Sequence, residues 1–245
     1  MAMRWTFLKR GRVMWPLGII LAGVLTAGAL TWFQPRFLLK SLSRKNPGVL
    51  FYVETKRPVL ALTIDDAPSS SLTPGILDIL DRYQTKATFF LIGDHLEGNE
   101  EIIARMKAAG HELGNHMARD EASIFLDKEE FKAQLLEVEE KIGLVGEMKW
   151  FRPGSGWFSP KMLAAAQSLG YRCCLGSIYP FDNKLRNNEF IKDTVLKRVF
   201  PGAILILHDG GPERDYILPL LEELLPALKA KGFEFLTLSE IQKLE

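Results

Sequence analysis

Short apolar runs alternate with amphipathic stretches from about residue 59 to the C-terminus. Seven runs rich in β-branched and aromatic residues predict strands, because they are short, apolar and bounded by turn residues. They lie at 59–64, 87–92, 112–115, 150–151, 172–179, 203–207 and 233–238. The run at 112–115 is the weakest of the seven.

The stretches between these runs carry apolar residues at helical spacing. Thr73-Pro74 and Ser159-Pro160 place a proline in a first turn, and Asp127 is a typical helix cap. Further helices are predicted at 99–109 and 216–231, each followed by a glycine. Strands that alternate with helices pair in parallel, so the pattern predicts an α/β fold. About seven strands suit a shortened, distorted (β/α) barrel, since a full eight-fold barrel takes about 250 residues.

The N-terminal segment has a different pattern. Basic residues up to Arg12 precede an uncharged run at 13–33, which exceeds the roughly 20 apolar residues that cross a bilayer. We therefore expect one transmembrane helix within 1–34, a juxtamembrane linker at 35–56 and a folded domain at 57–245. A cleavable signal peptide, with small residues at 27–29, is the alternative to a signal anchor.

Composition narrows the possible functions. Hydrophobic residues make up 47% of the 245 residues, charged residues 25%, and the net charge is +1. With no basic excess and no stripe of basic and aromatic residues, we expect no nucleic-acid partner. The two cysteines, Cys173 and Cys174, are adjacent, so a Cys-x-x-Cys zinc or redox site is excluded. They suit a buried strand.

Polar residues able to carry chemistry follow five of the predicted strands. In parallel α/β folds the carboxyl ends of the strands share one face, where catalytic residues gather. Each residue alone has an ordinary structural explanation, such as an Asx turn, a packed histidine or a surface ion pair. Five strand ends together favour a site. The residues are Asp65-Asp66, His116, Arg152, the segment 179–182, and His208-Asp209.

The residue types indicate acid–base and metal chemistry. Two adjacent carboxylates repel, so Asp65 or Asp66 must bind a cation or hold a proton. His116 has the position of a metal ligand, and Asp120 four residues later offers a second donor. His208 has a side chain suited to proton transfer near neutral pH.

These segments resemble the polysaccharide deacetylase family, carbohydrate esterase family 4, from about residue 57 to residue 240. The resemblance rests on Leu-Thr-Ile-Asp-Asp-Ala-Pro at 62–68, Gly-His-Glu-Leu-Gly-Asn-His at 110–116 and Phe-Arg-Pro-Gly-Ser-Gly-Trp at 151–157. Tyr-Pro-Phe-Asp at 179–182, Leu-Ile-Leu-His-Asp-Gly-Gly at 205–211 and Ala-Thr-Phe-Phe at 87–90 add to it.

The resemblance implies a metal-dependent hydrolase that removes acetyl groups from N-acetylated or O-acetylated polysaccharide. It also implies a divalent metal, Zn²⁺ first, with Mn²⁺, Co²⁺ or Ni²⁺ possible, and a domain outside the cytoplasm, anchored or secreted. The catalytic base is then Asp65, held by Arg152, and the general acid is His208, tuned by Asp182. The implied metal ligands are Asp66, His116 and Asp120.

Three positions depart from the family pattern. Asp120 stands where the second histidine ligand belongs, Asn183 replaces a tryptophan, and Gly154-Ser155 alter the loop after Arg152. Trp157 and Phe158 are candidates for a replacement aromatic wall. Two other functions therefore stay open: a degenerate, non-catalytic glycan-binding relative, and a metal hydrolase of a small non-sugar amide.

Overall fold

The computed structural model describes residues 34–144, 146–147, 149–210 and 212–245. The chain divides into two compact units, Met1–Leu42 and Ser43–Glu245. The predicted membrane segment lies outside the described residues, apart from Gln34. Within the described ranges, no helix is long and apolar enough to span a bilayer. The sheet and all candidate site residues belong to the second unit.

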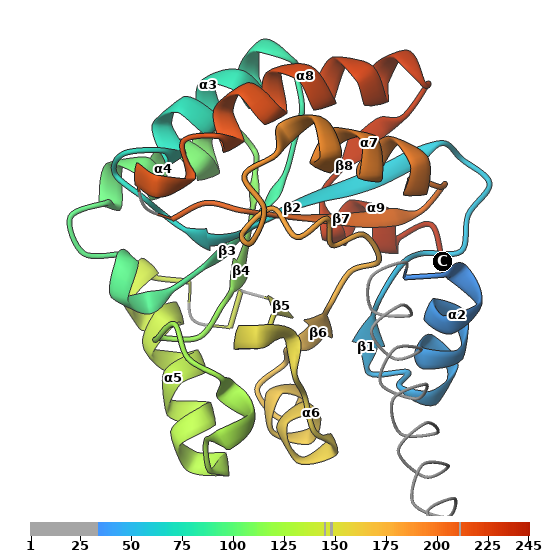
Figure 1. Ribbon diagram of the computed structural model, residues 1–245. Helices are drawn as coiled ribbons and strands as arrows, with labels where there is room; N and C mark the ends of the chain where they lie inside the picture. Colours follow the sequence, from blue (N-terminus) through green and yellow to red (C-terminus); the bar gives the residue numbers. More distant parts are fainter. Residues whose placement is uncertain (1–33, 145, 148, 211) are drawn as a thin grey trace, which may run out of the picture. The chain divides into compact units, whose positions relative to one another are not determined.

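A parallel sheet forms the centre of the second unit (Figure 1). Its strands follow the order β1–β6–β5–β4–β3–β2–β7, and β8 pairs with β2 beside this path. Every pair is parallel, so the predicted α/β fold is confirmed. The strands are β1 (Val49–Leu50), β2 (Val59–Ala67), β3 (Thr88–Leu91), β4 (Glu112–Asn115), β5 (Trp150–Phe151), β6 (Arg172–Cys174), β7 (Ala203–His208) and β8 (Glu234–Leu236).

The sheet closes on itself through one backbone bridge. Ile178, a few residues after β6, forms an isolated parallel bridge with Leu205 of β7. The Ile178 carbonyl accepts a hydrogen bond from the amide of Ile206, at 2.9 Å. The pairing order therefore runs from β7 through β2 to β6 and returns to β7, as around a barrel.

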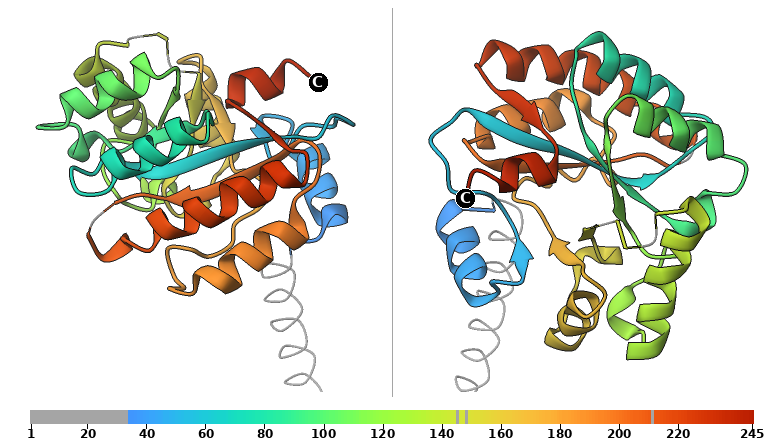
Figure 2. Two further views of the ribbon diagram at one scale, coloured as in Figure 1. Left: turned by 90° about the horizontal axis from the view of Figure 1, so that it is seen from above. Right: turned by 180° about the vertical axis from the view of Figure 1, so that it is seen from behind.

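Helices cover the outside of the sheet in two groups. α7 packs against α8, α8 against α3 and α3 against α4, while α5 packs against α6. Figure 2 shows α3, α7 and α8 along one flank of β2. The helices are α3 (Thr73–Arg82), α4 (Glu100–Ala108), α5 (Lys128–Ile142), α6 (Pro160–Gln167), α7 (Asn188–Arg198), α8 (Ile217–Ala230) and α9 (Leu238–Gln242).

Helix starts follow local side-chain chemistry. Asp127 accepts hydrogen bonds from the amides of Glu129 and Glu130, which fixes the start of α5. Ser159 accepts one from Met162 at the start of α6. Because these caps act within one turn, the sequence alone predicted them correctly.

The strand β2 alternates between two buried faces. Val59 and Ala61 lie in the interior cluster with Phe90 and Trp150. The alternation places Thr63 and Asp65 on the same interior side, because side chains two residues apart share a face. A column that begins apolar therefore ends in a carboxylate at the carboxyl edge of the sheet.

The structure differs from the sequence prediction in several segments. Residues 35–56, expected to be a linker, contain α2 (Arg36–Lys45) and β1, and β1 pairs with Cys173 and Cys174 of β6. Those cysteines are buried and free, as expected. The strand expected at 172–179 ends at Cys174. Helices α7 and α9 were not predicted: α7 carries few apolar residues among its polar ones, and α9 has only five residues.

Candidate active site

Asp65 and His208 meet at the carboxyl ends of two neighbouring strands. They are direct register partners in the β2–β7 ladder. The Oδ2 atom of Asp65 lies 3.9 Å from His208 Nε2 and 4.0 Å from His116 Nε2. The carboxylate therefore stands between the two imidazoles, as the sequence predicted for a site at this face.

Arg152 fixes the other oxygen of Asp65. Its Nη1 donates to Asp65 Oδ1 at 2.5 Å and to Thr63 Oγ1 at 2.9 Å, and its Nε donates to the Cys174 carbonyl at 2.9 Å. The side chain is only 3% exposed and stacks on the Phe90 ring, 4.2 Å from its centroid. A buried guanidinium held on several sides leaves Asp65 one orientation.

The place of Phe90 depends on a glycine in the next strand. A side chain at Gly114 would bring its Cβ within 2.7 Å of the Phe90 ring. The absence of a side chain at Gly114 thus lets Phe90 lie flat beneath Arg152.

His208 is paired with a buried carboxylate. Asp182 Oδ1 lies 2.9 Å from His208 Nδ1, and its Oδ2 accepts from the His208 amide at 2.8 Å. Burial alone would lower the pKa of His208, but the Asp182 charge and hydrogen bond raise it above its usual value. The Nε2 atom is left for the cleft, with the amide nitrogen of Asn183 at 3.3 Å.

Asp66 and His116 form a second pair. His116 Nδ1 lies 2.8 Å from the Arg152 carbonyl, which can only accept, so Nδ1 carries a hydrogen and Nε2 faces Asp66 Oδ1 at 3.3 Å. Burial alone would raise the pKa of Asp66, but His116, with His208 and Arg214, holds it well below its usual value. Although burial opposes it, the charges of Asp65 and Asp66 raise the pKa of His116 to about 9.

This pair suits a divalent cation. An imidazole whose Nδ1 hydrogen is held by a carbonyl presents its Nε2 lone pair, as metal-binding histidines do. The negative field that raises the pKa of His116 also favours a metal ion in place of the proton. Asp66 and His116 therefore fit as ligands.

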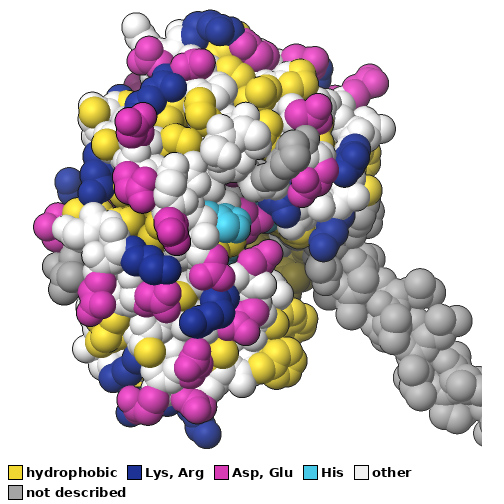
Figure 3. All heavy atoms as spheres, turned by 90° about the vertical axis from the view of Figure 1, so that its left-hand side faces the viewer, with side chains coloured by type: hydrophobic (Ala, Val, Ile, Leu, Met, Phe, Trp, Pro, Cys, Tyr) yellow, Lys and Arg dark blue, Asp and Glu magenta, His cyan; other side chains and the backbone are white. Residues whose placement is uncertain are grey.

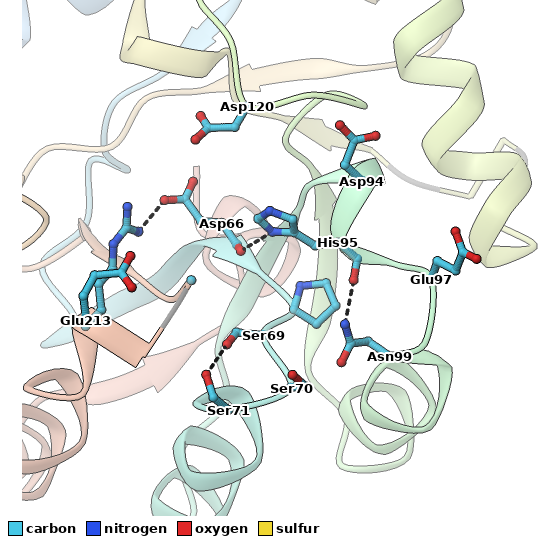
Figure 4. Close-up of a pocket in the computed structure, with 13 residues that line it drawn as sticks. Asp66, Ser69, Ser70, Ser71, Asp94, His95, Glu97, Asn99, Asp120 and Glu213 are labelled. Atoms are coloured by element: carbon cyan, nitrogen blue, oxygen red, sulfur yellow. Dashed lines mark hydrogen bonds and ion pairs between the residues drawn. The ribbon is translucent and has the colours of Figure 1, made fainter.

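Asp120 is less closely placed. It is exposed, on the loop after β4, and lines two adjoining cavities of about 520 and 490 Å³ that it shares with Asp66. Figure 4 shows both carboxylates facing the same part of the first cavity. Within the described residues, no group of three or more His, Cys, Asp or Glu side chains is close enough to hold a metal ion. The structure thus joins two of the three expected ligands.

Two site residues were not predicted from the sequence. Arg214 Nη1 lies 2.5 Å from Asp66 Oδ2 and lines both cavities. His95 lies with its Nδ1 2.9 Å from the backbone oxygen of Asp66 (Figure 4). Both lie in loops several residues beyond a strand end, His95 after β3 and Arg214 after β7, and the strand pattern does not fix side chains there.

The face around the first cavity is acidic. Figure 3 shows Asp and Glu side chains around one visible histidine. The acidic residues that line this cavity are Asp66, Asp94, Glu97, Asp120 and Glu213. His111, in contrast, is buried away from both cavities, where its Nδ1 accepts from the Ala87 amide.

Comparison with known proteins identifies the family. Residues 52–174 match the polysaccharide deacetylase family model. The chain is 32% identical over 196 residues to a peptidoglycan-N-acetylglucosamine deacetylase of Bacillus cereus, covering 79% of this chain and 92% of the relative. The chain therefore belongs to the polysaccharide deacetylase family.

Solved structures of similar fold include a deacetylase and a mutant of a CE4 family pseudoenzyme. The peptidoglycan N-acetylglucosamine deacetylase Bc1960, bound to 4-naphthalen-1-yl-N-oxidanyl-benzamide, superposes with a TM-score of 0.76 at 30% identity, covering 81% of this chain and 94% of that one. A mutant of BA3943, a CE4 family pseudoenzyme with restored enzymatic activity, gives 0.72 at 26% identity, covering 79% and 70%.

Proposed function

We propose that this protein removes acetyl groups from an N-acetylated polysaccharide, with a divalent cation at Asp66, His116 and Asp120. One observation carries the proposal: Asp65, fixed by Arg152, faces His208, fixed by Asp182, across 3.9 Å. A base and an acid held at this separation suit cleavage of one bond between them. Similarity to a peptidoglycan-N-acetylglucosamine deacetylase supports this substrate class.

The residues divide the proton transfers between them. Asp65 Oδ2 takes a proton from a water molecule as the water oxygen attacks the acetyl carbonyl carbon. His208, kept protonated by Asp182, gives the Nε2 proton to the departing amine nitrogen as the C–N bond breaks. The products are acetate and a free amino sugar, and solvent exchange resets both groups. An O-acetyl substrate would release an alcohol instead.

The cation would polarise the acetyl carbonyl and lower the pKa of water. Zn²⁺ is our first choice, because imidazole and carboxylate ligands both suit it. Two carboxylates also suit harder ions, so Mn²⁺, Co²⁺ and Ni²⁺ are to be tested beside it. We further propose that residues 1–34 anchor the domain in a membrane, on the outer side; the support is the apolar run at 13–33.

Acetate release is the direct test. Purified full-length protein is stripped with a chelator, reloaded with each metal, and assayed on peptidoglycan, chito-oligosaccharides and acetylated xylan. We expect activity only after reloading, and chiefly on the N-acetylated substrates. Asp65→Asn should bind metal as the parent does but lose at least about 100-fold in kcat. Asp66→Ala should lose metal, and parental turnover in either variant would refute the proposed roles.

The second candidate is a glycan-binding protein without catalysis. Asp120 in place of histidine favours it. A similar solved structure at 25% identity and a TM-score of 0.71, a BA3943 mutant, is described as a CE4 family pseudoenzyme. It predicts retention on insoluble peptidoglycan with no acetate released under any metal. Binding that survives both Asp65→Asn and Asp66→Ala, with no turnover in the parent, would select this function.

A further inference from the structure

Asp66 is held from two sides by groups of different kinds. Its Oδ1 atom faces His116 Nε2 at 3.3 Å, and its Oδ2 atom accepts from Arg214 Nη1 at 2.5 Å. Arg214 also donates to the backbone oxygen of Asp209. The side chain is 22% exposed, so a mostly buried cation touches a carboxylate already suited to bind a metal ion.

The loop after β7 is shaped for this contact. Gly210 has a φ of +94°, and a Cβ there would lie 3.2 Å from Asp66 Cβ and 3.5 Å from Arg214 Nη1. Without a side chain at Gly210, the backbone passes close to Asp66 and returns through η4 (Pro212–Arg214). The chain thus folds back after β7, so that the Arg214 guanidinium reaches Asp66 at the end of β2 and the backbone oxygen of Asp209 just after β7.

Arg214 changes the charge balance of the proposed metal site. Asp66 and Asp120 together carry two negative charges, which would neutralise a divalent ion and weaken its pull on a bound carbonyl. Arg214 adds one positive charge and lines both cavities in which Asp66 and Asp120 meet. It also holds Oδ2 by a hydrogen bond, and Oδ1 is the oxygen of Asp66 that faces His116.

We propose that Arg214 is a positioning residue that offsets the second carboxylate of the site, weakening metal binding while preserving the electrophilic strength of the bound ion. The inference rests on the proposed function, since it presumes the metal at Asp66, His116 and Asp120. Removal of Arg214 should therefore tighten metal binding and slow hydrolysis. If Arg214 were purely structural, its removal would lower both the metal affinity and the rate of hydrolysis.

Zinc titration calorimetry on the full-length, metal-free protein tests the first half. Partners of metal ligands change affinity by about 10 to 100-fold. Here the partner is itself a cation, so Arg214→Met should bind Zn²⁺ about tenfold more tightly, and Arg214→Lys should stay near the parent. Arg214→Gln, which keeps a hydrogen-bond donor without the charge, should follow Met. Unchanged or weaker binding in the Met and Gln variants overturns the inference.

Kinetics and a charge-balanced double variant test the second half. In Arg214→Met, kcat should fall about tenfold with little change in KM, because the defect lies in polarisation and not in substrate binding. Asp120→Asn combined with Arg214→Met removes one charge of each sign, and should return zinc affinity and part of kcat toward the parent. The inference is overturned if the two substitutions act additively, so that the double variant has a lower kcat than either single variant.

The outcome for the parent separates this inference from the proposed function. A parent that binds none of zinc, manganese and cobalt refutes the metal site and Arg214's role together. A parent that binds zinc and releases acetate, with an Arg214→Met variant of unchanged affinity, refutes only the role of Arg214.

Discussion

Arg152 serves two functional groups through different parts of one residue. Its guanidinium holds Asp65, and its backbone carbonyl accepts from His116 Nδ1. Any shift of the backbone at Arg152 therefore moves the proposed base and a proposed metal ligand together. Asp182 likewise makes two contacts, because its carboxylate binds both the backbone amide and the ring of His208.

Asp182→Asn should change the pH dependence of hydrolysis. The charge of Asp182 raises the pKa of His208, so the acid stays protonated to higher pH. Removing that charge should move the alkaline limb of the kcat profile to lower pH, and should lower kcat near neutral pH by at least about tenfold.

Tyr216→Phe is the matched control for this prediction. The Tyr216 hydroxyl donates to the Asp182 backbone oxygen at 2.5 Å, so its removal disturbs the same residue without touching the carboxylate charge. The alkaline limb should stay in place. Equal displacement in both variants would mean that position, and not charge, sets the pKa of His208.

At the scale of elements, the site depends on one close approach between neighbouring strands. Phe90 of β3 lies against Gly114 of β4 and supports the Arg152 guanidinium that follows β5. Three consecutive strands of the sheet thus set the position of one ion pair, Arg152–Asp65.

Gly114→Ala should disturb this arrangement from within the core. The added methyl group would lie 2.7 Å from the Phe90 ring, so the ring must tilt. Overpacking of this kind costs about 1–3 kcal/mol in the free energy of unfolding. We expect that loss in urea titrations, with kcat reduced beyond what stability explains. Gly48→Ala, where the nearest atom is 4.0 Å away, is the control and should change neither.

The elements predicted correctly share a local signal. Proline openings and the caps at Asp127 and Ser159 act within one turn, so α3, α5 and α6 could be read from the sequence. β1 could not, because a two-residue strand has no period and its partners lie more than 100 residues away. Helix α7 was missed despite its Asn187 cap, which accepts from the Phe190 amide.

The candidate site divides in the same way. Strand ends fix Asp65, His116 and His208, so their convergence followed from the pattern of elements. The partner of Asp66 is set by how the loop after β7 folds back, and no periodicity encodes that path. Arg214 was therefore invisible in the sequence, and the placement of Asp120 as a ligand stays a prediction.

For the whole molecule, pH should act on stability through a residue outside the site. Burial, with Lys86 and Arg105, lowers the pKa of His111 from 6.5 to about 4. Its Nδ1 accepts from the Ala87 amide, which requires the neutral ring. A histidine whose pKa is depressed by folding contributes stability above its unfolded pKa and loses it as pH falls. The window is therefore about pH 6.5 down to 4.

His111→Asn isolates this contribution, because the Asn side chain offers an acceptor near Nδ1 but does not titrate. The parent should lose about 3 kcal/mol more than the variant between pH 7.5 and pH 4, since one unit of pKa is about 1.4 kcal/mol. Urea unfolding at several pH values measures the difference. Parallel curves for the two proteins would show that His111 titrates normally.

The closed sheet has a seam, defined here as the contact between the chain at Ile178 and strand β7 at Leu205. The chain after β6 joins β7 through an isolated bridge between Ile178 and Leu205, outside the named strands. Asp182 lies four residues beyond Ile178, and His208 ends β7, so their two hydrogen bonds act as a clasp across the seam. The contact that tunes the general acid is thus also one of the hydrogen-bonded contacts that close the barrel. A fluctuation that parts the seam would switch off proton donation before the core unfolds, and the amide of Ile206 should exchange with solvent early in that opening.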